Sequence, residues 1–487
     1  MIRASVTGQV AALTVVSFDA LGLGDRSYLL SDGEVGVVVD AQRDPTPYLQ
    51  EAERLGIAIT AVFETHIHND YVSGGLALSR ATGATYAIPA GEPVSFSDKA
   101  SALEDGDALF AGNLQITAIS TVGHTDHHLA YLVELADGAK AERTVDHVVC
   151  TGGSLLVSST GRTDLLGLPS AEALARSQWR SVRHLLTSLP GDTPILPTHG
   201  FGSFCSATPT SGGLDPVPTL ARELEQNPAA LLDEDEFVAS VLAHLPPIPA
   251  YYRHMAPLNR KGPRAPLFEP VPMLEPARLQ EAIEGDVHRF VDLRGRRVFA
   301  AGHLPGTLNL ELGINLTTYL GWVVPWDAGL VLLAEDEAEI DEARRLIARI
   351  GREELSGAAL WSKLALEHRA NPAADGVRVS SYRVASFSEL AAESAGRPLS
   401  ELQVLDVRHP HEWEAGHLVG ARHMPLQELS GHRAEVPTEA QVWVHCGAGF
   451  RAAAAASILS GWGASPVLVD DTWDHAVAAG LAISAKS

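Results

Sequence analysis

The sequence predicts an α/β protein of three domains, and three observations support this fold class. Short β-branched segments alternate with turns and amphipathic helices over residues 1–205, which is typical of layered sheets and helices. A strand–loop–helix unit occurs twice in the C-terminal part, at 289–312 and 403–426, which predicts two parallel-sheet domains. The chain of 487 residues accommodates three domains of roughly 150 residues each.

The first domain is expected over residues 1–260. Two amphipathic segments, 44–56 and 170–189, predict helices, and an acidic helical segment at 233–245 extends the domain before a proline-rich linker. The expected strands are 36–40, 58–66, 114–121, 127–134, 146–152 and 193–199.

The two C-terminal copies are expected as domains over 273–370 and 380–487. In each copy a strand ends in Asp-x-Arg and is followed by a histidine within Ala-Gly-His-Leu-x-Gly. Acid–arginine pairs and turn histidines usually fix loops, so we interpret these residues as structural. They are Asp292, Arg294 and His303 in the first copy, and Asp406, Arg408 and His417 in the second.

Charge and cysteine content disfavour several classes of function. Acidic residues outnumber basic ones by 60 to 36, and the net charge of −24 argues against binding to nucleic acids or anionic membranes. No apolar run reaches the roughly 18 residues of a transmembrane helix. The three cysteines are widely spaced, so no disulfide framework is expected and a cytoplasmic location is predicted.

Residues 442–459 carry the strongest chemical signal. A strand is expected to end at His445, and an Ala-rich helix follows a short loop. Glycines let the loop N–H groups point inward, and the helix N-terminus and an arginine add positive charge. Together they predict a lowered pKa and a nucleophilic thiolate for the loop cysteine. The loop residues are Cys446, Gly447, Ala448, Gly449, Phe450 and Arg451.

This loop, with residues 405–425, resembles the rhodanese family of sulfurtransferases. The resemblance implies that Cys446 carries a sulfane sulfur as a persulfide and passes it to a thiol, cyanide or sulfite. It also implies that the N–H groups of 447–451 and the Arg451 side chain hold the terminal sulfur or an anionic donor. The first copy reads LLAEDEAE at 332–339 and lacks the cysteine, so we expect a degenerate domain that packs and spaces its neighbours.

Three histidine clusters follow apolar strands in the first domain. Residues 64–75 place His66, His68 and Asp70 at alternate positions after a strand, so their side chains can converge. His124 follows a second strand and His199 a third. Imidazoles and a carboxylate at several strand ends predict a metal site.

The order of these clusters resembles the metallo-β-lactamase fold, an αββα sandwich, and within it the persulfide dioxygenases that are fused to rhodanese domains. The resemblance includes residues 198–205 and 251–259 and spans essentially the full chain. It implies one Fe(II), or else Zn(II), per chain, held by His66, His124 and residue 153. The implied reaction is the oxidation of a thiol persulfide by O2 to sulfite.

The sequence departs from this family at two ligand positions. Gly153 stands where the family has aspartate, and Tyr71 stands where the first motif ends in histidine. One expectation is that His68 completes a three-histidine site with His66 and His124. The other is a weak or empty site in a domain that only binds ligand. Gly153→Asp is expected to tighten iron binding if the pocket is still shaped for a carboxylate.

Two further groups are assigned around this site. Asp70 and His199 are expected to support the ligands or to act as secondary ligands. Cys205 follows His199 on the same loop, and the resemblance implies that it takes up persulfide sulfur as a catalytic residue; a buried loop cysteine is the alternative. Cys150 is expected in the core.

Three functions follow from these expectations. The first is a bifunctional enzyme that oxidises a low-molecular-weight thiol persulfide and transfers sulfane sulfur through Cys446, with thiosulfate or sulfite as further partners. The second is a sulfurtransferase with a non-catalytic first domain, motivated by Gly153. The third is a thioester hydrolase of the glyoxalase II type, which needs two metal ions. A homodimer is expected by analogy with acidic members of the fold.

Overall fold

The computed structural model describes most of the chain in two compact units. One unit comprises Met1–Leu267 with Arg345–Gly351, and the other comprises Phe268–Arg344 with Arg352–Ser487. The described residues are 2–10, 13–136, 146–200, 202–207, 217–243, 245–275, 279, 282–283, 285, 288–364, 378–395, 397–481 and 483–484. Within these ranges no helix is both long and apolar enough to cross a membrane.

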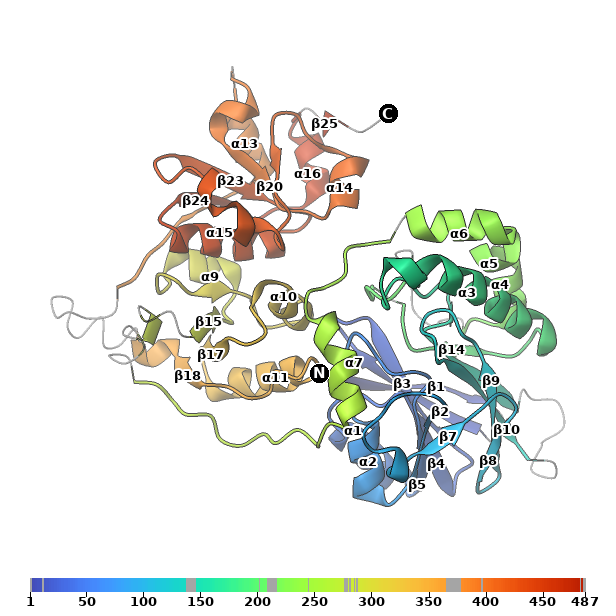
Figure 1. Cartoon of the computed structure of the whole chain (residues 1–487). Coiled ribbons are helices and arrows are strands. Elements are labelled where there is room, and N and C mark those ends of the chain that lie inside the picture. The colour runs from blue at the N-terminus through green and yellow to red at the C-terminus, as the bar shows by residue number, and fades with distance from the viewer. Residues whose placement is uncertain are drawn as a thin grey trace. The chain divides into compact units, whose positions relative to one another are not determined.

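Two sheets lie at the centre of the first unit (Figure 1). The larger sheet runs in the order β1 (Ile2–Val10), β2 (Leu13–Ala20), β3 (Asp25–Ser31), β4 (Val35–Val39), β5 (Ala58–Phe63), β6 (Thr85–Pro89) and β7 (Ser101–Leu103). The smaller sheet runs in the order β14 (Ile195–Pro197), β11 (His147–Gly152), β10 (Leu129–Leu135), β9 (Leu114–Ser120) and β8 (Ala108–Ala111). A short hairpin, β12 (Leu155–Leu156) and β13 (Ser159–Thr160), follows β11.

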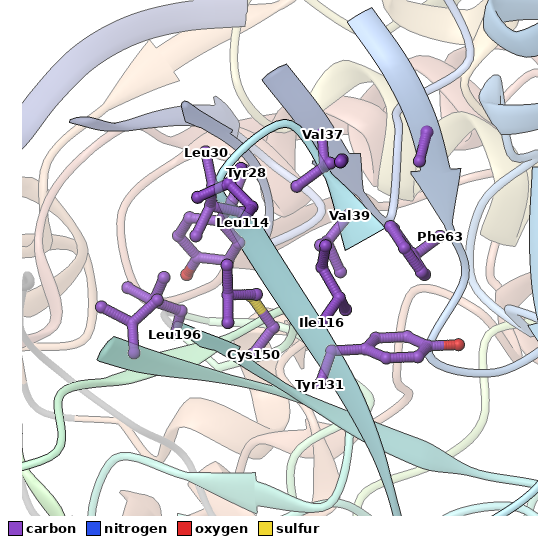
Figure 2. Close-up of a cluster of buried hydrophobic side chains, with 14 of the residues drawn as sticks. Tyr28, Leu30, Val37, Val39, Phe63, Leu114, Ile116, Tyr131, Cys150 and Leu196 are labelled. Atoms are coloured by element: carbon purple, nitrogen blue, oxygen red, sulfur yellow. The ribbon is translucent and has the colours of Figure 1, made fainter. Parts of the chain in front are cut away.

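Alternating side chains fill the space between the two sheets. Val37 and Val39 of β4 belong to the inner cluster, whereas Val38 between them belongs to the cluster on the outer face. Figure 2 shows the inner cluster, where Cys150 packs among apolar side chains of both sheets. Cys150 is therefore a core residue, as the sequence predicts.

Helices cover both outer faces of this pair of sheets. Tyr48 of α1 (Thr46–Leu55) and Leu78 of α2 (Gly75–Thr82) pack on the larger sheet, and Val182 of α3 (Leu168–Ser188) packs on the smaller one. The result is the αββα sandwich that the sequence predicts. The unit also contains α4 (Leu220–Gln226), α5 (Pro228–Leu231), α6 (Glu234–Ala243) and α7 (Tyr252–Lys261).

The second unit contains two sheets in which every described strand pair is parallel, so the prediction of parallel-sheet domains is confirmed. The first copy orders its strands as β16 (Leu308–Asn309), β15 (His288–Asp292), β17 (Gly329–Ala334) and β18 (Gly357–Leu360). The second copy orders them as β19 (Arg383–Ala385), β24 (Ser465–Val469), β23 (Gln441–His445), β20 (Val404–Asp406) and β22 (Arg422–His423). The two strands β21 (His417–Leu418) and β25 (Ile483–Ser484) form a separate pair.

The helices of the two copies pack around these sheets. In the first copy they are α9 (Arg296–Ala301), α10 (Leu316–Val323) and α11 (Glu337–Ala348). In the second they are α13 (Phe387–Glu393), α14 (Pro410–Ala415), α15 (Phe450–Gly461) and α16 (Trp473–Ala478).

The alanine-rich composition of α15 has a packing reason. Residues 452–456 are all buried, because α15 packs on its own sheet and also against the first copy. Ser457 accepts a hydrogen bond from the Asn309 backbone N–H at 3.0 Å, and a Cβ on Gly461 would lie 3.6 Å from the Cα of Gly306. Small side chains permit this close approach of the two copies.

Candidate metal centre and thiolate loop

The histidine clusters meet where strands of both sheets end. His66, His68 and Asp70 lie in the loop between β5 and α2, His124 lies between β9 and β10, and His199 follows β14. All five side chains are buried. Candidate ligands that lie far apart in the sequence are therefore close together in the fold.

Three of these imidazoles form a compact donor group. The metal-binding atoms of His66, His124 and His199 lie within 4.8 Å of one another. The Nε2 atoms of His66 and His199 are 3.2 Å apart. The ring centre of His124 lies 4.9 Å from that of His66 and 5.2 Å from that of His199. The Nε2 atom of His124 has no hydrogen-bond partner among the described residues.

Neighbouring oxygens orient the rings of His66 and His124. The Nδ1 atom of His66 lies 2.9 Å from the Thr65 hydroxyl, and Nδ1 of His124 lies 2.8 Å from the Arg162 carbonyl oxygen. Burial first, and neighbouring imidazoles second, lower the pKa of both histidines well below the usual value. Both rings are therefore neutral, with Nε2 available as a ligand atom.

His199 is oriented by two carboxylates. Its Nδ1 atom lies 3.0 Å from Asp25 and 3.2 Å from Asp70. Burial would lower the pKa of His199, but Asp70 and Asp25 outweigh it and raise the value to about 10. Burial and Asp70 raise the pKa of Asp25 to about 7. Sequence reasoning missed Asp25, because a single aspartate at the start of β3 carries no local motif.

His68 has a different environment from the other three histidines. Its Nε2 atom lies 3.3 Å from Asp40, 3.2 Å from Glu64 and 2.9 Å from the Tyr71 hydroxyl. Burial would lower the pKa of His68, but the two acids raise it to about 9. The sequence grouped His68 with His66 and His124, whereas the structure groups His199 with them.

A second donor group shares His199 with the first. It consists of His68, Asp70 and His199, whose ligand atoms also lie within 4.8 Å of one another. Nδ1 of His68 is buried without a hydrogen-bond partner in the described chain. A third such group, Asp40, Glu64 and His68, is already joined by hydrogen bonds.

Gly153 lies directly against His124. A Cβ on Gly153 would lie 2.2 Å from Cδ2 of His124, and a Cβ on Gly161 would lie 2.6 Å from its Nδ1. The imidazole thus fills the volume that an aspartate side chain would need. This geometry reverses the expectation that Gly153→Asp tightens iron binding.

The motif loop is held from a distant helix. The side chain of Asn259 on α7 accepts a hydrogen bond from Ser73 N–H at 2.8 Å and donates to the carbonyl oxygens of His68 and Tyr71, both at 2.9 Å. Asn259 therefore positions the loop that carries the first histidines. In the sequence, the segment 251–259 only resembles the family, and no local pattern predicts the contacts that Asn259 makes.

Cys205 is a buried thiol near this pocket. Its Sγ atom lies 3.7 Å from the Tyr252 hydroxyl. Burial raises the pKa of the thiol well above its usual value, and Asp70 and Asp25 raise it further. Cys205 is therefore protonated at neutral pH, and its catalytic role stays a prediction.

The donor set fits a first-row divalent metal. Three imidazole Nε2 atoms converge, each with Nδ1 bonded to an oxygen, which is the arrangement that fixes histidine ligands in metal sites. The unsatisfied Nε2 of His124 indicates a missing partner at this point. A bound cation would replace the proton on Nε2 of His199.

In the Cys446 loop, one of the predicted N–H groups, that of Gly449, faces the sulfur. β23 ends at His445, Cys446 is buried, and α15 begins at Phe450. The Gly449 N–H donates a hydrogen bond to Sγ of Cys446 at 3.1 Å. Gly449 has φ of +89°, and a Cβ there would lie 2.4 Å from Asp470, so glycine is required.

Arg451 is engaged by a carboxylate. Its two terminal nitrogens pair with both carboxylate oxygens of Glu412, with an Nη2–Oε1 distance of 2.8 Å. The family resemblance implies that Arg451 holds the terminal sulfur or an anionic donor. In the structure, the guanidinium of Arg451 faces Glu412 instead.

The repeated Asp-x-Arg residues are structural in both copies. Arg408 binds Asp406 at 2.6 Å and the Gly416 carbonyl oxygen at 2.7 Å. Arg294 repeats these contacts with Asp292 at 2.6 Å and with Gly302 at 3.0 Å. In the first copy, acidic side chains bind the backbone N–H groups at the start of α11. The Glu339 carboxylate accepts a hydrogen bond from Glu335 N–H, and the Asp336 carboxylate accepts one from Glu339 N–H.

Two segments match models of known families. Residues 23–199 match the metallo-β-lactamase superfamily, and residues 388–474 match the rhodanese-like domain. Human mitochondrial persulfide dioxygenase ETHE1 is 28% identical over 217 residues, which is 44% of this chain and 74% of that protein. A hydroxyacylglutathione hydrolase of Rhizobium johnstonii is 30% identical over 175 residues, which is 36% of this chain and 61% of that protein.

A crystal structure extends this similarity. A metallo-β-lactamase from Staphylococcus aureus aligns with a TM-score of 0.62 and 26% identity, covering 72% of this chain and 99% of that one. This coverage exceeds the extent of the first unit, so the structural likeness continues into the second unit.

Proposed function

Because this chain joins a metallo-β-lactamase domain to a C-terminal rhodanese domain, we propose that it is an enzyme of sulfur metabolism that acts on thiol persulfides. The first domain oxidises a low-molecular-weight thiol persulfide with O2 to sulfite, and Cys446 transfers sulfane sulfur. The observation that carries this proposal is that one chain has both a buried three-imidazole group and a buried loop cysteine whose sulfur accepts the Gly449 N–H. The similarity to human persulfide dioxygenase supports it.

The metal ligands in this proposal are Nε2 of His66, His124 and His199. When bound there, a single iron ion supplies the activation of O2. Asp25 accepts the Nδ1–H of His199, and Asp70 lies 3.2 Å from the same nitrogen. The two carboxylates keep Nε2 of His199 aimed at the other two rings. All three imidazoles are buried, which keeps bulk water away from the donor group.

The sulfur transfer step uses only groups of the second unit. The Cys446 thiolate attacks the terminal sulfur of a persulfide R–S–SH, the S–S bond of the donor breaks, and R–S⁻ leaves. Cys446 is then a persulfide, and the Gly449 N–H faces its inner sulfur. Sulfite from the first domain accepts the outer sulfur and forms thiosulfate.

Metal analysis combined with O2 uptake tests the proposal. Freshly purified protein should contain one iron per chain at most and should consume O2 with glutathione persulfide. His199→Ala should remove most of the metal, whereas His68→Ala should retain more of it, which separates the two histidine sets. Protein reconstituted with Fe(II) that consumes no O2 with any persulfide would rule out the oxidation step. If sulfur transfer remains, the first domain is a binding module.

A hydrolase is the second candidate. The hydroxyacylglutathione hydrolase similarity favours it, and the group of His68, Asp70 and His199 offers ligands for a second ion. A ratio of two metals per chain, with hydrolysis of a glutathione thioester, would support this candidate. One metal or fewer per chain would exclude it.

A further inference from the structure

The charges that border the Cys446 loop are paired. Arg451 holds Glu412 of α14 through two hydrogen bonds. A Cβ on Gly447 would lie 3.3 Å from Nη2 of Arg451 and 3.4 Å from Oε1 of Glu412, so the pair directly adjoins the residue after the cysteine. The positive charge of Arg451 is thus compensated by a carboxylate.

The opposite side of the loop is paired in the same way. Arg296 of the first copy donates to Asp470 at 2.6 Å and pairs with Glu311, and it also reaches the Ala448 carbonyl oxygen at 3.3 Å. Arg297 donates to Asp470 at 2.5 Å. Each of the arginines named here has a carboxylate partner within the described residues.

Glu412 is ionised at neutral pH. Burial would raise its pKa, but the hydrogen bonds and charge of Arg451 outweigh burial and lower the value to about 2. A doubly charged donor such as thiosulfate that enters this loop beside Arg451 therefore meets the fixed negative charge of Glu412.

The first copy supplies an uncharged aromatic side to the same loop. Tyr319 of α10 lies with its ring centre 5.3 Å from that of Phe450, and its hydroxyl lies 3.5 Å from Nε2 of His409. Both aromatic rings are partly exposed. Burial raises the pKa of Tyr319 to about 12, so the ring is neutral. Such a surface suits the carbon portion of an organic donor.

We propose that Glu412, together with Tyr319, makes Cys446 selective for organic thiol persulfides over thiosulfate. This inference rests on the proposed function of Cys446 as sulfur carrier. Thiosulfate carries its sulfonate one bond from the sulfur that is transferred, so its charge must enter the loop. In R–S–SH that position is a sulfur bonded to carbon, and the transfer releases R–S⁻ as described above.

Donor competition on the full-length protein tests this selectivity. Loading of Cys446 by one sulfur atom is followed by mass spectrometry with glutathione persulfide or thiosulfate as donor. Wild-type kcat/KM should favour the persulfide by about tenfold or more. Glu412→Gln keeps the side-chain size and an oxygen acceptor, and it should raise kcat/KM for thiosulfate about tenfold with little change for the persulfide. Tyr319→Ala should raise KM for the persulfide only.

A charge-matched control separates local from general electrostatics. Glu401→Gln removes one exposed acid of the same domain and should leave the donor preference unchanged. Equal loading by both donors in the wild type overturns the selectivity, and this measurement needs no variant. An unchanged preference in folded Glu412→Gln also overturns it. Failure of both donors to load Cys446 instead refutes the proposed carrier role.

Discussion

At the scale of single residues, two glycines determine how His124 is placed. Gly153 and Gly161 lie against opposite parts of its imidazole, and neither position has room for a Cβ. The His124 ring can occupy its position because residue 153 is a glycine and has no side chain. The neighbouring His199 supplies the third nitrogen of the donor group.

Substitution of Gly153 should weaken metal binding. Gly153→Ala and Gly153→Asp both place a Cβ against His124, which must move away from His66 and His199. We expect metal content to fall by at least about half and stability to fall by about 1–3 kcal/mol. Elemental analysis and chemical denaturation measure the two effects. Gly295→Ala, where no atom lies within 4 Å of the new Cβ, is the control. Tighter metal binding by Gly153→Asp would contradict this prediction.

His409 should make stability depend on pH. Burial, followed by the charge of Arg451, lowers the pKa of His409 to about 4 from its usual value of about 6.5. Between these values the unfolded chain binds a proton that the folded chain does not bind, so stability falls as the pH decreases from about 6.5 to about 4. Above that window His409 contributes no pH dependence.

Denaturation at pH 7 and pH 5 measures this contribution. The wild type should lose about 1–2 kcal/mol more than His409→Gln between the two conditions. His411→Gln changes an exposed neighbour on α14 and should behave as the wild type. Equal losses in the wild type and His409→Gln would show that His409 does not titrate in this range.

At the scale of elements, the two C-terminal copies share one framework with different loops. In each copy an arginine binds the aspartate at the end of a central strand and stacks on a tryptophan, at 3.7 Å for Arg408 on Trp473 and 3.6 Å for Arg294 on Trp361. The framework therefore does not depend on the cysteine. The two copies differ in the loop after the next strand, which contains Cys446 in the second copy and acidic residues in the first.

Breaking this framework should destabilise each copy. Arg408→Ala and Arg294→Ala each leave a buried aspartate without its cation, which should cost about 3–5 kcal/mol. Arg397→Ala removes an exposed ion pair with Glu393 and should cost about 1 kcal/mol or less. Chemical denaturation followed by tryptophan fluorescence compares the three variants. Similar losses of unfolding free energy in all three variants would show that the buried pairs stabilise the protein no more than the exposed pair does.

At the scale of the whole molecule, the two candidate centres belong to different compact units. Each unit has its own buried cores, and no residue of the His66 group lies in the unit that contains Cys446. The two reactions should therefore communicate only through sulfite that is released by one unit and consumed by the other.

Complementation between variants tests this independence. His199→Ala should keep sulfur loading of Cys446, and Cys446→Ser should keep its metal and O2 uptake. Neither variant alone should form thiosulfate from glutathione persulfide and O2. An equal mixture of the two should restore thiosulfate formation, because sulfite diffuses between molecules. No restoration in the mixture would indicate direct transfer within one chain.

Local patterns in the sequence predicted the layered domains, the parallel sheets, the Cys446 loop and the buried Cys150. These features depend on short-range periodicity and on motifs that a strand and the following loop carry together. His66 and His124 could be named as ligand candidates for the same reason, since each ends a recognisable apolar strand.

The tertiary structure alone decided which groups surround those residues. Asp25 reaches His199, Asn259 holds the His68 loop, and Glu412 neutralises Arg451, although each pair except the last is separated by most of a domain. Even that last pair joins two different helices, α14 and α15. Strand ends bring distant segments together, and the direction of each side chain then determines which groups it contacts. The spacing of residues in one sequence does not predict these contacts.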